Sequence, residues 1–281
     1  MNNVFYIDID PIIFHLGPVS VGWYGLMVAL SVIFLVGWML WQNNKHKTLN
    51  NDTLLTACLV GIPSGVIFSK ILHVIDQWKF YTENPGLIFS GQGLTIWGAV
   101  LGAAIGIWLY AKISGQMRFA EFGDLVAPGV IFAQAIGRVG CTLNGCCYGI
   151  ESDAACAVIY TNPSSFAPNG IPVLPTQIFE IGYDFLVFII LLLLRNKLKP
   201  QGSLFVVYFA LYGAWRFGIE FIRSGSPFLF GMHQAQFIGL VVLLITVPII
   251  IFRVRWKKKE DELPGTPATI TEASDNNTKI G

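Results

Sequence analysis

The chain has 281 residues, of which 54% are hydrophobic and 12% are charged, and its mean hydropathy is +0.60. A soluble globular domain carries about 25% charged residues, so this composition excludes such a domain and indicates a protein that crosses a membrane several times. The formal net charge of +1 says little about partners, because in a membrane protein the distribution of Lys and Arg matters more than their total; we expect no nucleic-acid partner.

Seven apolar segments approach the length of about 20 residues with which a helix crosses a bilayer. In chain order they are residues 21–41, 54–75, 94–111, 122–136, 178–194, 204–222 and 237–252. We therefore predict an all-α, polytopic membrane protein with seven transmembrane helices in a single transmembrane domain, residues 1–259. The polar stretch 260–281 is expected to be a disordered cytoplasmic tail.

Basic residues predict the orientation of these segments. They follow the first, third, fifth and seventh segments, and cytoplasmic loops are the ones enriched in Lys and Arg. The four clusters are Lys45 and Lys47; Lys112 and Arg118; Arg195, Lys197 and Lys199; and Arg253, Arg255 and Lys257 to Lys259. The N-terminus is then outside, the C-terminus is cytoplasmic, and the functional loops 1–20, 77–93, 137–176 and 223–236 face outside.

Three charged residues of the sixth segment share one face of the predicted helix. Arg216, Glu220 and Arg223 follow one another at i, i+4 and i+7, and a charge at the bilayer centre costs at least about 2.5 kcal/mol. One interpretation is an ion-pair ladder that only ties helices together. The other is that the surplus positive charge, with Arg138 at the outer end of the fourth segment, holds a phosphate, which arginine suits geometrically.

The fifth segment carries a second polar face, formed by Gln177, Glu180 and Asp184. Its carboxylates either pair with nearby arginines or line a site. Asp124, near the inner end of the fourth segment, is expected to be a helix cap or a helix-pairing residue. Tyr24, at the outer start of the first segment, is explained by an aromatic belt alone.

Residues 137–149 follow an apolar segment and contain one cation, four glycines and three cysteines. Glycine lets a ligand approach the backbone closely, and arginine offers a fixed fork of donors. We predict that this stretch forms the floor of an active site.

Four cysteines belong to the predicted outer loop: Cys141, Cys146, Cys147 and Cys156. In an oxidising compartment two disulfides are the leading interpretation, with pairing of Cys146 to Cys147 the least expected. A zinc site of four thiolates is an alternative, although the spacing is unlike that of zinc knuckles, and free nucleophilic thiols are a third. Cys58 reads as a packing residue. The histidines, including His233, lack metal-ligand spacing, and we predict no metal site.

Several short motifs occur in order between residues 23 and 236. They are Trp23-Tyr24-Gly25-Leu26-Met27, Gly93-Leu94-Thr95-Ile96-Trp97-Gly98, Asp124-Leu125-Val126-Ala127-Pro128, Gly137-Arg138-Val139-Gly140, Asn144-Gly145, Pro175-Thr176-Gln177-Ile178-Phe179-Glu180 and Tyr212-Gly213-Ala214-Trp215-Arg216, followed by Glu220, Arg223 and Gln236. Together they resemble the motifs of the bacterial prolipoprotein diacylglyceryl transferases.

This resemblance implies transfer of the diacylglyceryl group of phosphatidylglycerol to the lipobox cysteine of a prolipoprotein signal peptide. It implies a multi-pass protein of the cell inner (cytoplasmic) membrane with no cofactor. The residues implied for catalysis are Arg138, Arg216 and Tyr24. Those implied for substrate binding are Asn144, Gly98, Gly140, Glu220, Arg223 and Gln177.

Three positions depart from the family pattern. Trp97 stands where a histidine is usual, Cys141 where an asparagine is usual, and Cys146 where a glutamate is usual. Because Trp97 cannot accept a proton, the role of a histidine base does not carry over. The alternatives are the same reaction with a rebuilt outer rim, transfer to a different acceptor, or a non-catalytic protein that binds anionic lipid.

Overall fold

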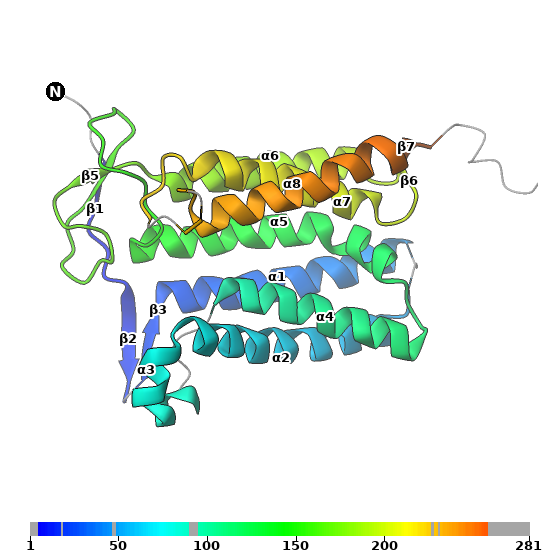
Figure 1. Cartoon of the computed structure of the whole chain (residues 1–281), viewed down its shortest axis with the longest axis horizontal. Helices are drawn as coiled ribbons and strands as arrows, with labels where there is room; N and C mark the ends of the chain where they lie inside the picture. The colour runs from blue at the N-terminus through cyan, green and yellow to red at the C-terminus, as the bar shows by residue number, and fades with distance from the viewer. Residues whose placement is uncertain are drawn as a thin grey trace, which may run out of the picture.

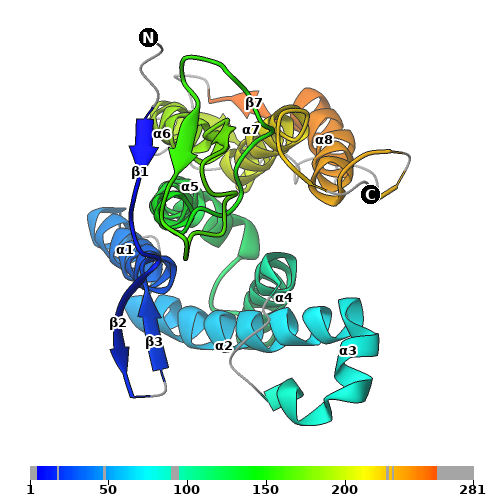
Figure 2. The same ribbon diagram turned by 90° about the vertical axis from the view of Figure 1, so that its left-hand side faces the viewer.

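The computed structural model describes residues 5–17, 19–46, 49–89, 95–225, 228–229 and 231–257. Within these residues seven apolar helices pack side by side; most of them run along one direction (Figure 1), and α2 is inclined to the others when the bundle is viewed from its end (Figure 2). They are α1 (Trp23–His46), α2 (Asn51–Asp76), α4 (Ile96–Ser114), α5 (Phe119–Asn144), α6 (Thr176–Leu194), α7 (Ser203–Ile219) and α8 (Gln234–Arg253). Five of them, α1, α2, α5, α6 and α8, are long and apolar enough to cross a membrane. The chain is therefore a mostly helical, polytopic membrane protein, and each predicted segment coincides with one helix.

The prediction of an all-α chain is wrong in its connections, which contain short strands. β1 (Phe5–Ile7), β4 (Val158–Tyr160) and β5 (Pro172–Val173) form a sheet in the order β1-β4-β5, with β1 parallel to β4. Two further pairs are β2 (Ile12–Leu16) with β3 (Val19–Gly22), and β6 (Leu198–Lys199) with β7 (Arg255–Trp256). The first two groups lie at one end of the helices, where α3 (Trp78–Glu83) and the short 3-10 helix η1 (Pro85–Phe89) follow α2.

Helix α5 is the central element of the bundle. In its apolar window 56% of the residues are buried, against 6 to 28% in the other four long helices. Viewed from the end, α5 lies between α1 and α6 (Figure 2). Asp124 near its start caps α7, because its carboxylate accepts the N–H groups of Gly202 at 2.6 Å and Phe205 at 2.9 Å. The expectation of a helix cap at this position is confirmed.

The end of α5 corrects the prediction that residue 137 opens a loop. The helix continues to Asn144 and stops at Gly145, whose φ of +71° is left-handed. Gly145 N donates to Thr142 O and Cys146 N donates to Cys141 O at 3.1 Å, which is a Schellman motif. The turn brings Cys146 back over the last turn of the helix, next to Cys141.

Glycines on α4 allow it to pack closely against α2. A Cβ added at Gly98 would lie 2.6 Å from Ser69 Cα, and one added at Gly102 or Gly106 would lie 2.5 Å from an oxygen of Ser64. Small residues at this four-residue spacing let membrane helices approach each other. The predicted tail 260–281 and the side chain of Trp97 lie outside the described part of the structure.

Candidate active site

A chain of ion pairs links α5, α6 and the end of α7. Arg138 Nη2 lies 2.8 Å from Glu180 Oε1, and Arg216 Nη1 lies 3.7 Å from Glu180 Oε2. Arg216 Nη2 lies 2.6 Å from Glu220 Oε1, and the same oxygen lies 3.2 Å from Arg223 Nη1. Glu180, Arg216 and Glu220 are 2%, 7% and 5% exposed. The structure thus brings four of the predicted site residues into one network with a buried centre: Arg138, Arg216, Glu220 and Arg223.

The ion pairs of the network join three guanidinium groups to two carboxylates, those of Glu180 and Glu220. The carboxylate of Asp184 lies beside them on α6. Within the described residues, Nε and Nη1 of Arg216 are buried and have no hydrogen-bond partner. Buried donors in proteins are nearly always bonded, so these two nitrogens are exceptions, although Nη1 also lies 3.7 Å from Glu180 Oε2.

Two members of the network were not predicted from the sequence. Gln134 Nε2 lies 3.3 Å from Glu180 Oε1 and 3.4 Å from Asp184 Oδ1, so it bridges the carboxylates of α6. Its position one helical turn before Arg138 was the available signal. His233, for which the sequence analysis predicted only that it is no metal ligand, places Nδ1 3.1 Å from Glu220 Oε2 and so connects the start of α8 to the network.

Tyr24 and Gly140 meet where α1 packs on α5. A Cβ added at Gly140 would lie 2.9 Å from Met27 Cβ and 3.3 Å from Tyr24 Cα, so this contact requires glycine. Tyr24 itself is 43% exposed. Tyr24 belongs to the first turn of α1. Its neighbour Gly140 lies two residues after Arg138 in α5.

Three predicted substrate-binding residues also make structural contacts. Gly98 lies against the backbone of α2, where it permits helix packing. Gln177 is 1% exposed and donates from Nε2 to Cys146 O at 2.8 Å, so it anchors the loop after α5. Asn144 ends α5, and its carbonyl accepts the N–H of Phe166 at 3.2 Å.

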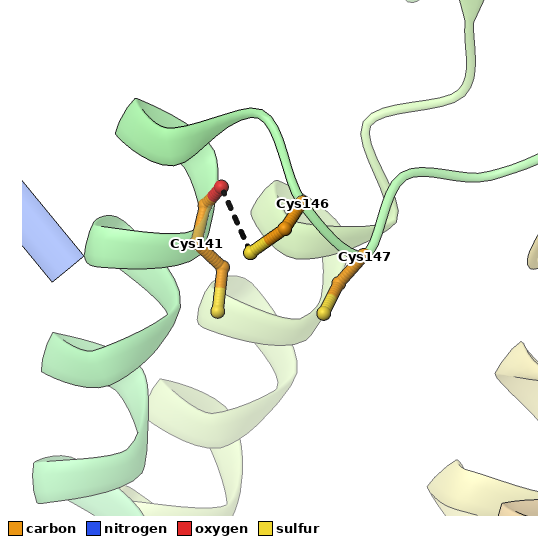
Figure 3. A group of neighbouring side chains, drawn as sticks. All are labelled: Cys141, Cys146 and Cys147. Carbon is orange, nitrogen blue, oxygen red and sulfur yellow. Dashed lines mark hydrogen bonds between the residues drawn. The ribbon is translucent and has the colours of Figure 1, made fainter. Parts of the chain in front are cut away.

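The expected disulfides are not formed. All five cysteines belong to the described residues, and all are free thiols. The Sγ atoms of Cys141, Cys146 and Cys147 lie within 4.8 Å of one another (Figure 3). Cys156 is exposed and does not belong to this group. Three neighbouring thiols can form at most one disulfide among themselves. Cys156, the fourth thiol that two disulfides would need, lies elsewhere.

The loop that follows α5 and contains Cys146 and Cys147, called the cysteine loop below, is connected to the ion-pair network. Arg138 Nη1 lies 3.9 Å from Cys141 Sγ, and Thr176 Oγ1 donates to Cys147 O at 2.7 Å. Ile150 N donates to Ile222 O at 2.9 Å, next to Arg223. Hydrogen bonds from the Cys141 and Cys146 thiols lower the pKa of the Cys147 thiol, and the charge of Arg223 acts in the same direction.

Tyr160 supports the same loop from β4. It is 1% exposed, and its hydroxyl donates to Thr142 O at 3.1 Å in the last turn of α5. Burial raises the pKa of Tyr160 to about 12, so the hydroxyl keeps its proton and remains a donor.

An apolar groove of about 300 Å³ lies between α6 and α7. It is lined by Phe179, Ala214, Trp215, Gly218, Ile219 and Ile222. Phe179 and Trp215 immediately precede Glu180 and Arg216, so the groove runs along the flank of the two helices that carry the network.

Comparison with known proteins places this geometry in a family. The sequence model described as prolipoprotein diacylglyceryl transferase matches residues 11–252. A phosphatidylglycerol–prolipoprotein diacylglyceryl transferase of Dehalococcoides mccartyi is 48% identical over 259 residues, which cover 92% of this chain and 99% of the relative. Relatives with the same description in Clostridium perfringens (numbered 2) and Staphylococcus aureus are 37% and 34% identical, over 79% and 90% of this chain and 86% and 92% of their own length. This chain belongs to the prolipoprotein diacylglyceryl transferase family.

Proposed function

We propose that this chain transfers the diacylglyceryl group of phosphatidylglycerol to the thiol of the lipobox cysteine in a prolipoprotein signal peptide. The names of its relatives describe an enzyme with these two substrates. The observation in this chain that carries the proposal is that Arg138 and Arg216, from different helices, meet at Glu180.

In this reaction the acceptor sulfur attacks the diacylglyceryl carbon that is bonded to the phosphate oxygen. A C–S bond forms, the C–O bond breaks, and glycerol phosphate leaves with the bonding electron pair, while the thiol gives up its proton. Negative charge therefore grows on the phosphate in the transition state. Preorganised cations at that position stabilise it more than they stabilise the ground state.

The arginines have distinct roles in this proposal. Arg138 and Arg216 bind the leaving phosphate, and Arg216 is the main contact because its Nε and Nη1 make no hydrogen bond. Glu220 and Arg223 hold Arg216 in place. Tyr24, exposed at the start of α1, positions the headgroup from the outer rim, together with Asn144 at the end of α5.

The apolar groove between α6 and α7 suits one acyl chain of the lipid. Its lining is carbon-rich, and it runs beside Glu180 and Arg216. A phospholipid in the surrounding bilayer would then keep its chain against the helices while its phosphate reaches the network.

The topology proposed with this function has seven membrane crossings in the inner membrane, with the N-terminus outside. The basic ends of α1 and α4 and the β6–β7 pair, which contains Lys199 and Arg255, lie at one end of the bundle (Figure 1). The cysteine loop lies at the opposite end, where phosphatidylglycerol of the outer leaflet would meet a secreted acceptor.

The test is incubation of the purified protein with phosphatidylglycerol labelled in its diacylglyceryl part and a lipobox peptide. A peptide that gains the label as a thioether supports the proposal, and the same peptide with serine in place of cysteine is the control. Labelling of a small thiol in place of the peptide would assign a different acceptor. Lipid binding without any transfer would refute the enzymatic function.

A further inference from the structure

We propose that Cys141, Cys146 and Cys147 form a three-thiolate site for a thiophilic divalent cation such as Zn²⁺, with a fourth position that takes the acceptor thiol. The second half of this inference rests on the proposed function. The three residues stand at the outer end of the ion-pair network, and neither the Arg138 contact nor the loop anchors account for three thiols at one point.

The sulfur positions are close to those of a metal site. The three Sγ atoms lie within 4.8 Å of one another, and the Cys146 thiol donates to Cys141 O at 3.8 Å (Figure 3). Zinc–sulfur bonds of about 2.3 Å in tetrahedral geometry set sulfur atoms about 3.8 Å apart. Binding one zinc ion would therefore bring the most distant sulfur atoms closer together by up to about 1 Å.

The backbone fixes these positions independently of the thiols. The Schellman turn returns Cys146 to Cys141. Cys147 has a φ of +67°, which is uncommon for a residue other than glycine. Gln177 and Thr176 hold the carbonyls of Cys146 and Cys147 against α6. The carbonyl groups of Cys146 and Cys147 are therefore held on the side of α6, and the thiols of both residues lie near Cys141.

The charges around the cluster favour a thiolate complex. Three thiolates and one divalent cation carry a net charge of −1. Arg138 Nη1 lies 3.9 Å from Cys141 Sγ while its Nη2 lies 2.8 Å from Glu180, so one guanidinium group faces both the cluster and the network. A bound cation would therefore be coupled directly to the residue proposed to bind the phosphate.

The site has three protein ligands and an accessible side. Cys141 is buried, but Cys146 and Cys147 are partly exposed, so a cation and a further ligand can reach them from the loop. Structural zinc sites are closed by four protein ligands, whereas catalytic sites keep the fourth position open. Within the described residues, no other cysteine, histidine or carboxylate completes this group.

The fourth ligand we infer is the thiol of the acceptor cysteine. A thiol that binds zinc is deprotonated, and its proton passes to water. The zinc-bound thiolate sulfur then forms the C–S bond as the C–O bond breaks and the phosphate leaves. The cluster would thus supply the activated nucleophile in a chain whose Trp97 cannot act as a base.

Metal binding is tested on the reduced, full-length protein in detergent after dialysis against Zn²⁺. We expect one equivalent of zinc in the wild type and in the controls Cys58→Ser and Cys156→Ser, and its loss in Cys141→Ser, Cys146→Ser and Cys147→Ser. Zinc should also protect the three cluster thiols of the wild type from alkylation, while Cys156 stays reactive. The alkylation measurement uses only the wild-type protein, so its result does not depend on whether any variant folds. Equal alkylation with and without zinc would overturn the metal site.

The open position is tested with Co²⁺ in place of Zn²⁺. Thiolate-to-cobalt charge-transfer bands are expected, and the lipobox peptide should shift the visible d–d bands while its serine counterpart leaves them unchanged. An identical spectrum with both peptides would refute acceptor binding. A specific spectral shift without lipid transfer would refute the proposed function and leave the metal site standing, so the two failures are distinguishable.

Discussion

Arg138 of α5 and Arg216 of α7 bind opposite oxygens of one carboxylate, that of Glu180. The distances are 2.8 Å and 3.7 Å, and Glu180 is 2% exposed. Two cations from different helices are held close together only because a buried anion lies between them. The arrangement keeps the guanidinium groups preorganised while leaving part of Arg216 unbonded.

The two arginines should be essential for transfer. Replacing Arg138 or Arg216 by alanine removes a donor to the leaving phosphate, and loss of one such donor lowers kcat by about 10²–10³-fold. Arg138→Lys should recover only part of the activity, because lysine keeps the charge and loses the planar fork. The measurement is the initial rate of peptide labelling at saturating lipid.

Arg255→Ala is the matched control, since this exposed arginine lies at the opposite end of the bundle. It should transfer lipid at the wild-type rate. Wild-type activity in either Arg138→Ala or Arg216→Ala would remove that residue from the phosphate site.

Stability should depend more on Glu180 than on Asp184. Glu180→Gln leaves the buried Arg216 and the partly buried Arg138 without their shared carboxylate, and breaking a buried ion pair costs about 3–5 kcal/mol. Asp184→Asn keeps an oxygen for the Gln134 amide, its hydrogen-bond partner at 3.4 Å, and should cost less. Thermal unfolding in one detergent compares the two variants. Equal unfolding midpoints for the two variants would show that Glu180 does not stabilise the network more than Asp184 does.

Gly98 should act through packing and not through lipid binding. In Gly98→Ala the new methyl group meets the backbone of Ser69 at 2.6 Å, and overpacking of this kind costs about 1–3 kcal/mol. Gly182→Ala, where an added Cβ has open space, is the matched control and should be as stable as the wild type or more so. A raised KM for phosphatidylglycerol with unchanged stability in Gly98→Ala would instead support the substrate-binding role predicted from the sequence.

The helices were predictable because each is a long apolar segment, but their ends were not. The stretch that begins with Gly137 and Gly140 was predicted to be a loop, because glycine weakens an isolated helix. In the structure Gly140 is required by the contact with Met27, and α5 continues to the left-handed Gly145. The strand β4 pairs with β1, more than a hundred residues away, and such a partner leaves no local pattern.

The site was predictable where residues repeat at helical spacing. Arg216, Glu220 and Arg223 showed this pattern, and the structure links them. His233 was missed because it is a single polar residue whose partner lies on another element. The state of the cysteines depends on distances between Sγ atoms, which spacing along the chain does not give.

Tyr160 should make stability depend on pH in the alkaline range. Its pKa in the folded state is about 12, above the ordinary value of 10.0. The unfolded chain therefore loses this proton first, so the contribution of Tyr160 is complete below pH 10 and is lost as the pH rises towards 12.

Tyr160→Phe removes this pH-dependent contribution to the free energy of unfolding. It also leaves Thr142 O without its hydrogen-bond donor, which lowers the free energy of unfolding by about 1–3 kcal/mol at neutral pH. Tyr6→Phe is the matched control, because Tyr6 is 69% exposed. Unfolding midpoints of the three proteins are compared from pH 8 to pH 11, where the wild type and Tyr6→Phe should fall more steeply than Tyr160→Phe. Parallel curves for all three would show that the Tyr160 hydroxyl does not hold the end of α5.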